Sequence, residues 1–143
     1  MTGYGTAPAE AATQSPSCAP PTGNLIPLLH ELRHALERWL EQGEQHTIDL
    51  RSMPLAPGEE DSLLEQLGVG EITARLSALG HSDIIETRYP GVWLITHYNE
   101  HEKVIGRFLE VCEVPCIVRS QSDDIRAGLA RLEDTLANAE TTA

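Results

Sequence analysis

The sequence has few aromatic residues and few cysteines, and it lacks any long hydrophobic run. Aromatic residues make up 4% of the chain, so an aliphatic core is expected. Three cysteines, Cys18, Cys112 and Cys116, without export features favour a reducing compartment. No basic and apolar leader begins the sequence, and no stretch approaches the length of a bilayer span. We therefore expect a cytoplasmic protein with no membrane insertion.

Basic residues are also scarce, since 10 Lys and Arg stand against 22 Asp and Glu, for a net charge of −12. Nucleic acids and anionic membranes bind basic surfaces, so this balance argues against both. It favours a well solvated surface or a partner that carries basic residues. The 143 residues and the 41% hydrophobic content suit one globular domain.

The composition changes along the chain. Residues 1–23 are rich in Ala, Pro, Thr, Ser and Gly and show no periodicity, which predicts a disordered tail containing Cys18. Residues 24–138 carry the periodic hydrophobic pattern of a single domain. Residues 139–143 are expected to fray at the C-terminus.

A hairpin between Ile84 and Tyr98 is the centre of the predicted fold. Two β-branched and aromatic runs flank the sequence Tyr89-Pro90-Gly91, in which proline and glycine favour a chain reversal. A plain turn matches strand twist poorly, so we expect a bulge or a longer loop there. The second strand is apolar on both faces, which places it centrally in a sheet.

Helical periodicity predicts helices over residues 25–42, with Asn24 as N-cap, over residues 57–67, and after Ser120 or Ser122. Alternation predicts further strands at residues 47–50, 72–78 and 103–114, with a turn at residues 80–83. The predicted fold class is α+β. It is an antiparallel sheet of four to five strands covered by three helices on one face.

The sharpest motif is His30-Glu-Leu-Arg-His34, an H-E-x-x-H pattern on the first predicted helix. In zinc hydrolases two histidines at this spacing bind Zn²⁺ and the glutamate activates water. His30 and His34 fall opposite the leucine stripe, among Glu37, Arg38 and Glu41, which is typical of a solvated face. A zinc hydrolase therefore stays a remote alternative.

Cys112 and Cys116 form a C-x₃-C pair at the end of a predicted strand. Two thiolates alone do not make a structural zinc or iron–sulfur site, which usually takes four protein ligands. The pair is compatible with a structural role, or with metal or iron–sulfur cluster handling in which His30 and His34 could take part. No phosphate loop or nucleophile elbow is present in the sequence. The residues indicate a binding module with no cofactor, rather than an enzyme.

Several runs together resemble the conserved region of HupH-type hydrogenase expression/formation proteins. They are residues 29–38, 47–55, 57–60, 67–71, 86–93 and 118–125, and the resemblance extends in order from Leu25 to Leu132. The chain is more similar to short HupJ/HoxT-like members than to full-length HupH or HyaF proteins. In this family H-E-L-R-H belongs to the first helix, and the cysteine pair is not a fixed feature.

The resemblance implies a cytoplasmic accessory factor in the maturation of [NiFe] uptake hydrogenases. Its implied partners are the immature iron–sulfur small subunit, or the signal peptide of that subunit, and other hydrogenase accessory proteins. An acidic surface suits a twin-arginine segment. We expect Tyr89, Pro90, Gly91 and Trp93 to form a contact loop. The alternative is that Trp93 belongs to the core, and the exposure of its side chain distinguishes the two.

Overall fold

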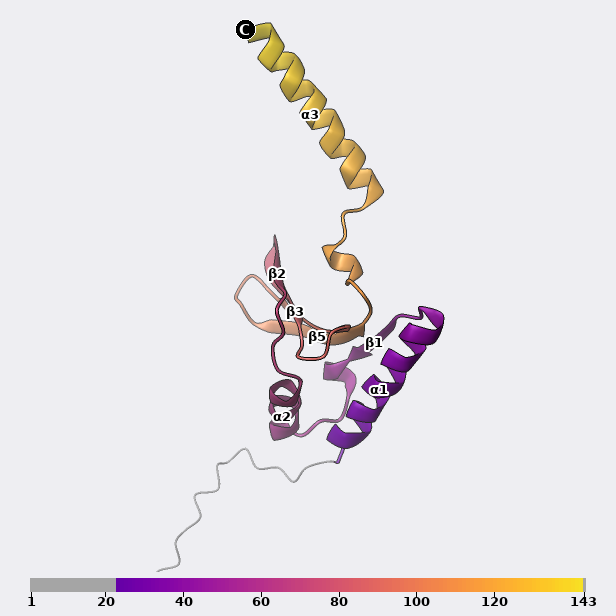
Figure 1. Cartoon of the computed structure of the whole chain (residues 1–143). Coiled ribbons are helices and arrows are strands. Elements are labelled where there is room, and N and C mark those ends of the chain that lie inside the picture. Colours follow the sequence, from indigo (N-terminus) through magenta and orange to yellow (C-terminus); the bar gives the residue numbers. More distant parts are fainter. Residues whose placement is uncertain (1–22, 143) are drawn as a thin grey trace, which may run out of the picture. The chain divides into compact units, whose positions relative to one another are not determined.

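A computed structural model describes residues 23–142 of the chain. The elements, in order, are α1 (Leu25–Gln42), β1 (His46–Asp49), the 3₁₀ helix η1 (Leu50–Ser52), α2 (Pro57–Leu67), β2 (Thr73–Ala78), β3 (Gly80–Glu86), β4 (Val92–Tyr98), β5 (Val104–Val111), the 3₁₀ helix η2 (Cys116–Val118) and α3 (Ser122–Thr142) (Figure 1). The described chain divides into two compact units, one ending at Cys112 and one beginning at Glu113. The single domain over residues 24–138 stays a prediction. The tail predicted for residues 1–23 lies outside the described residues, apart from Gly23.

Five antiparallel strands form one sheet in the order β1-β5-β4-β3-β2. β4 is the central strand, as its apolar side chains on both faces predict. Its residue Trp93 lies opposite Glu86 of β3 and Glu110 of β5. The five-stranded antiparallel sheet and the three helices confirm the predicted α+β fold class.

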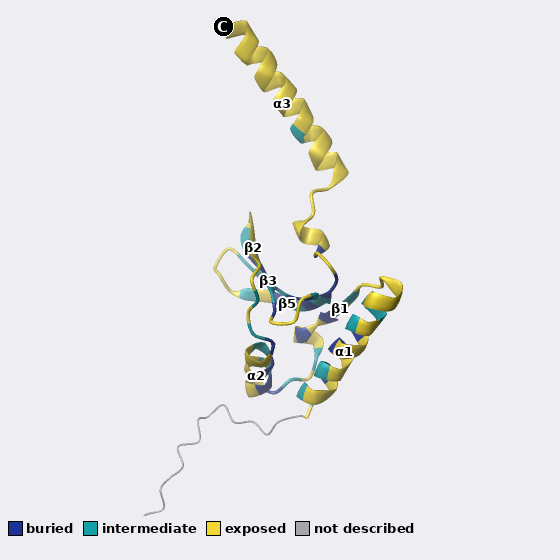
Figure 2. Cartoon of the chain, in the orientation of Figure 1, coloured by how far each residue is buried: buried dark blue, intermediate teal, exposed yellow. Residues whose placement is uncertain are grey.

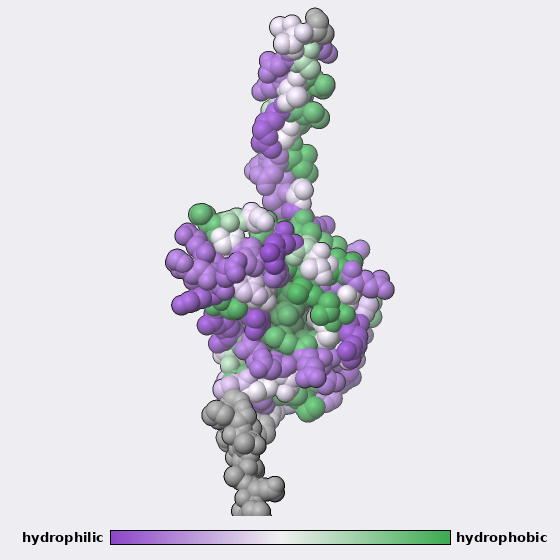
Figure 3. Space-filling model, turned by 90° about the vertical axis from the view of Figure 1, so that its left-hand side faces the viewer, coloured by the Kyte–Doolittle hydropathy of each residue, from purple (hydrophilic) through white to green (hydrophobic). Residues whose placement is uncertain are grey.

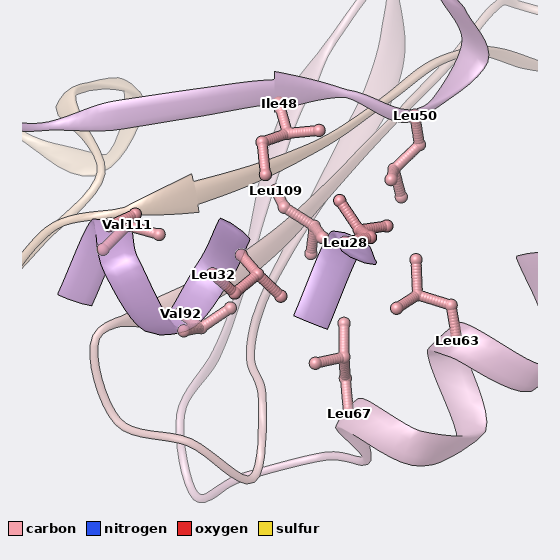
Figure 4. Packing of buried hydrophobic residues seen from close by; sticks show 10 residues of the cluster. Leu28, Leu32, Ile48, Leu50, Leu63, Leu67, Val92, Leu109 and Val111 are labelled. Carbon is pink, nitrogen blue, oxygen red and sulfur yellow. The ribbon is translucent and has the colours of Figure 1, made fainter. Parts of the chain in front are cut away.

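The main core lies between the sheet and the two helices α1 and α2. Leucines of both helices point toward aliphatic side chains of β1, β4 and β5 (Figure 4), and Figure 2 shows buried residues on parts of α1 and α2. The cluster consists of Leu28, Leu32, Ala35, Ile48, Leu50, Leu63, Leu67, Val92, Leu109 and Val111. Each fully buried leucine contributes about 1.5–3 kcal/mol. The helical leucine stripes and the alternating strands therefore account for this layer.

A second, smaller cluster lies on the other face of β4. It contains Trp93 and Ile95 together with Ile84 of β3 and Cys112. Val92 belongs to the first cluster, so adjacent residues of β4 enter different clusters. The prediction that β4 is apolar on both of its faces is therefore confirmed.

Two local predictions are wrong, the turn at residues 80–83 and the end of the last strand. The turn predicted for residues 80–83 is a strand, because the chain reverses around Leu79 and Gly80 takes a φ of +88°, which glycine adopts without steric cost. Asn24 is the N-cap residue of α1, as predicted, although its side chain makes no capping bond and its amide donates to the carbonyl oxygen of Pro54 at 3.0 Å. β5 ends at Val111 and not at Val114, since the N–H of Cys112 already turns to the carbonyl oxygen of Gly91 at 3.0 Å.

Candidate functional site

The connection between β3 and β4 is a loop with a fixed conformation. The buried hydroxyl of Thr87 donates to the carbonyl oxygen of Val92 at 2.8 Å and accepts from the N–H of Tyr89 at 3.2 Å. The N–H of Val92 closes the turn on the carbonyl oxygen of Tyr89 at 3.0 Å. Gly91 takes a φ of +93°, where a side chain would be strained. The loop is longer than a plain turn, as expected, and its own hydrogen bonds hold it.

The four residues of the predicted contact loop fall into two groups. Tyr89 and Pro90 are exposed, with Tyr89 at 42%, and Gly91 is half-buried. Trp93 is only 4% exposed, and its indole N–H donates to the carbonyl oxygen of Cys112 at 3.2 Å. Burial of Trp93 supports the alternative that its side chain belongs to the core. The contact loop therefore stays a prediction for Tyr89, Pro90 and Gly91, while the Trp93 side chain lies in the interior.

An apolar pocket of about 300 Å³ lies beside this loop. Its walls come from α1, the end of α2, Tyr89 and the first residue of β4, and the lining residues are Leu29, Leu32, Arg33, Leu36, Leu67, Tyr89 and Val92. A volume of this size is at the lower end of ligand pockets and accommodates a large side chain. Tyr89 joins the pocket to the exposed loop, so the two form one candidate binding surface, called here the α1–Tyr89 pocket.

The charged side chain of the α1–Tyr89 pocket is already paired. The guanidinium of Arg33 lies 3.2 Å from the carboxylate of Glu37, one turn later on α1, and both side chains are about half exposed. An exposed pair of this kind is weak and easily exchanged for another partner. The pocket therefore combines apolar walls with one ion pair that a bound segment could replace.

The helical stripe of α1 showed that Leu29, Leu32 and Leu36 are apolar positions. It could not show that part of this stripe lines an open pocket, because Leu67 and Tyr89 come from segments distant in sequence. Figure 3 shows that hydrophobic side chains also gather at the centre of one face of the molecule, with hydrophilic side chains around them. The pocket is thus a product of tertiary packing.

The His and Glu side chains of the H-E-x-x-H motif contact different partners and do not form a common site. His30 and His34 are both exposed, and His34 Nδ1 lies 3.6 Å from the Glu37 carboxylate. The Glu31 carboxylate lies instead 3.0 Å from His46 Nε2 at the start of β1. Within residues 23–142, no three His, Cys, Asp or Glu side chains are grouped so that they could hold a metal ion.

The two described cysteines differ in exposure. Cys112 is 2% exposed and belongs to the cluster around Trp93, whereas Cys116 is exposed at the start of η2. Cys112 closes the first compact unit and Cys116 belongs to the second. Cys18 lies outside the described residues. The burial of Cys112 fits the structural role more closely than metal or cluster handling.

Comparison with known proteins identifies the family. A family model described as "HupH hydrogenase expression protein, C-terminal conserved region" matches residues 23–139. The chain belongs to this family. The resemblance seen in the sequence is therefore confirmed, and the H-E-L-R-H run lies within the matched region.

Two curated relatives in the same family are similar over most of this chain. The hydrogenase expression/formation protein HoxQ of Azotobacter vinelandii is 30% identical over 113 residues, which are 78% of this chain and 40% of HoxQ. The corresponding protein HupH of Rhizobium leguminosarum bv. viciae is 28% identical over 111 residues, or 78% of this chain and 39% of HupH. The chain thus spans about two fifths of the length of these relatives.

A solved structure supports the fold. The hydrogenase expression protein HupH from Thiobacillus denitrificans is 41% identical and superposes with a TM-score of 0.79, covering 83% of this chain and 99% of that one. Its agreement with the five-stranded sheet supports the α+β architecture of the family. In residues 23–142, none of the helices is both long and apolar enough to span a bilayer.

Proposed function

We propose that this chain is a non-enzymatic accessory protein in the maturation of a nickel–iron uptake hydrogenase. In this proposal it acts in the cytoplasm and binds the immature iron–sulfur small subunit, or the signal peptide of that subunit, before export. Membership of the HupH family and the names of its relatives as hydrogenase expression/formation proteins support the pathway. The observation that carries the binding step is the apolar α1–Tyr89 pocket.

The pocket suits a protein segment that has not yet folded. A large apolar side chain that enters it leaves water and contacts Leu29, Leu36 and Val92. Burying one such side chain contributes about 1.5–3 kcal/mol. A folded subunit has already buried its apolar side chains, whereas an immature subunit and the apolar stretch of a signal peptide still expose theirs. The pocket therefore favours the immature form.

The net charge of −12 supports the same partner. A twin-arginine signal peptide is basic at its start, and an acidic protein attracts it over a distance and raises the association rate. This contribution is screened by salt, whereas the apolar contact in the pocket is not. Binding is therefore expected to slow as the salt concentration rises, with a smaller effect on dissociation.

Native mass spectrometry of the chain co-expressed with a hydrogenase small-subunit precursor tests the proposal. The expected result is a complex with the summed mass of the two proteins. A precursor lacking its signal peptide separates the two targets, since loss of the complex indicates the signal peptide and retention indicates the body of the subunit. The proposal is overturned if neither the full precursor nor the precursor without its signal peptide forms a complex with the chain. A monomer carrying stoichiometric zinc or iron would instead support the metal-handling alternative.

Substitutions in the α1–Tyr89 pocket test where binding occurs. Leu29→Ala and Tyr89→Ala remove side chains that line the pocket, and each is expected to weaken binding by roughly tenfold. Leu40→Ala is the matched control, because Leu40 lies on the same helix, is 83% exposed and is not a lining residue. Equal affinity of all three variants and the parent chain would rule out this surface.

A further inference from the structure

Helix α3 carries an apolar stripe that no other part of its own compact unit covers. Four side chains, Ile125, Leu129, Leu132 and Leu136, are each 54–58% exposed, and α3 contains no buried residue. Figure 3 shows hydrophobic side chains along one edge of this helix, at the top of the view, with hydrophilic ones on the rest of it. A stripe of large aliphatic side chains on a 21-residue helix is typical of a helix that packs on another helix.

The spacing within the stripe selects the kind of packing. The intervals from Ile125 to Leu129, Leu132 and Leu136 are four, three and four residues. This is the alternation of the d and a positions of a heptad repeat, in which side chains of two helices interlock. Arg131 and Asp134 then fall on the outer side of the helix. The pattern therefore fits a close, nearly collinear helix pair.

An antiparallel pair of α3 helices gives a consistent register. If Ile125 of one copy lies opposite Leu136 of the second copy, Leu129 lies opposite Leu132 in the next layer. The two-fold symmetry of the pair repeats both layers, so all four apolar side chains of each copy are covered. In a symmetric homodimer the same surface of each copy must be complementary to itself. The stripe meets this requirement, because each of its four apolar side chains lies opposite another one in the second copy.

Charge distinguishes the antiparallel from the parallel arrangement. In the antiparallel register, Arg126 of one copy lies beside Glu133 of the second copy, between the same two layers, and symmetry makes this pair twice. In a parallel pair, the neighbour of Glu133 across the interface would be Gly128, so no such pair forms. Arg126 is 76% exposed and pairs with Asp123 on its own helix at 3.0 Å, a contact that is readily exchanged.

We propose that α3 binds α3 of a second copy of this chain, antiparallel, through Ile125, Leu129, Leu132 and Leu136. The juxtaposition of Arg126 with Glu133 across the pair sets the orientation. Four layers make a small interface, so the dimer dissociates on dilution. The proposal concerns the second compact unit and is independent of binding at the α1–Tyr89 pocket.

Sedimentation of the full chain over a range of concentrations tests the dimer. The parent chain is expected to pass from monomer to dimer below about 1 mM, the range of weak complexes. Leu129→Asp places a charge in two layers of the symmetric dimer and is expected to raise the dissociation constant by at least about tenfold. Ala130→Asp is the matched control, because it puts the same side chain on the outer face of α3.

Two outcomes would overturn the dimer. One is a parent chain that stays monomeric up to about 1 mM, a concentration that equals the dissociation constant of a weak complex. The other is a dimer that Leu129→Asp and Ala130→Asp weaken equally. Circular dichroism of both variants shows whether helix α3 persists, so that a loss of association is not mistaken for a loss of helix.

Charge reversal tests the orientation. Arg126→Glu and Glu133→Arg each place like charges together in the antiparallel pair, and each is expected to weaken association by roughly 2- to 10-fold. The double variant restores opposite charges and is expected to return to the parent affinity. Arg131→Glu and Asp134→Arg make the same charge changes on the outer face. An unrestored double variant, or controls with equal effects, would overturn the antiparallel arrangement.

Discussion

The indole N–H of Trp93 donates to the carbonyl oxygen of Cys112 at 3.2 Å. This bond joins β4 to the residue that follows β5, and the N–H of Cys112 returns a bond to the carbonyl oxygen of Gly91 at 3.0 Å. The two bonds attach the base of the Tyr89–Gly91 loop to the interior. The exposed Tyr89 therefore belongs to a loop whose base is held by hydrogen bonds through Cys112, and Trp93 supplies one of these bonds.

Trp93→Phe separates this supporting role from a contact role. Phenylalanine keeps most of the apolar ring but cannot donate to the carbonyl oxygen of Cys112, so this hydrogen bond is lost. The free energy of unfolding is expected to fall by about 0.5–1.5 kcal/mol. Urea unfolding measures this loss, and affinity for the precursor is expected to stay within about twofold while the protein is folded. Parent-like stability with lost binding would instead place Trp93 in the contact.

Gly91→Ala tests the geometry of the same loop. Gly91 has a φ of +93°, and an added Cβ would lie 3.3 Å from Cδ2 of Leu36, a residue of the α1–Tyr89 pocket. We expect a loss of about 1–2 kcal/mol in unfolding free energy from the backbone strain and the close contact. Gly43→Ala is the control, because Gly43 has a φ of +67° but open space around the added Cβ. Gly91→Ala should also reduce precursor binding, whereas Gly43→Ala should not.

Glu59→Ala tests the start of α2. The Glu59 side chain is 7% exposed, and its two oxygens accept from the backbone N–H groups of Ala56 at 3.1 Å and Gly23 at 3.2 Å. Alanine removes both acceptors, which costs the buried N–H of Ala56 this hydrogen bond, whereas the N–H of the exposed Gly23 can bond to water. Urea unfolding should show a loss of about 1–3 kcal/mol. Glu65→Ala, an exposed position of the same helix, is the control, and equal effects of the two variants would contradict this role.

The elements with strong periodicity were predictable from the sequence. The bounds of α1 and α2 follow from their leucine spacing and from Gly43 and Gly68 at their ends. The hairpin before β3 was not predictable, because its Gly80-His-Ser-Asp83 composition is that of a turn although Ser82 is buried and contacts His97 at 2.6 Å. Local composition cannot report a partner supplied by a neighbouring strand.

The candidate site was predictable only in part. The Tyr89-Pro90-Gly91 sequence indicated the loop, and the loop is present with Tyr89 exposed. Alternation placed Trp93 on a face of β4 but could not say that this face is covered. The pocket itself depends on how α1, α2 and the loop pack, since its walls come from positions as distant as Leu29 and Val92. Sequence patterns identify apolar faces, whereas tertiary packing decides which parts stay open.

Glu110 makes the stability of the folded state depend on pH, and the direction of this dependence follows from its environment. It lies on β5 opposite Trp93, and burial raises the pKa of its carboxyl, although a hydrogen bond from Gln45 at 3.1 Å and the charge of His97 act in the opposite direction. Because the pKa is higher in the folded state, this group's contribution to stability is present below the ordinary glutamate pKa. The contribution is lost as the pH rises through the folded pKa.

Glu110→Gln removes that titration and keeps an oxygen that can accept from Gln45. The variant is expected to gain stability relative to the parent as the pH rises from acid to neutral, because the parent alone must then bury a charged carboxylate. Urea unfolding at a series of pH values measures the difference, and Glu113→Gln, at an exposed position, is the control for loss of one negative charge. A difference that shrinks with rising pH would require the folded pKa to be lowered, which is the opposite of what burial at this position produces.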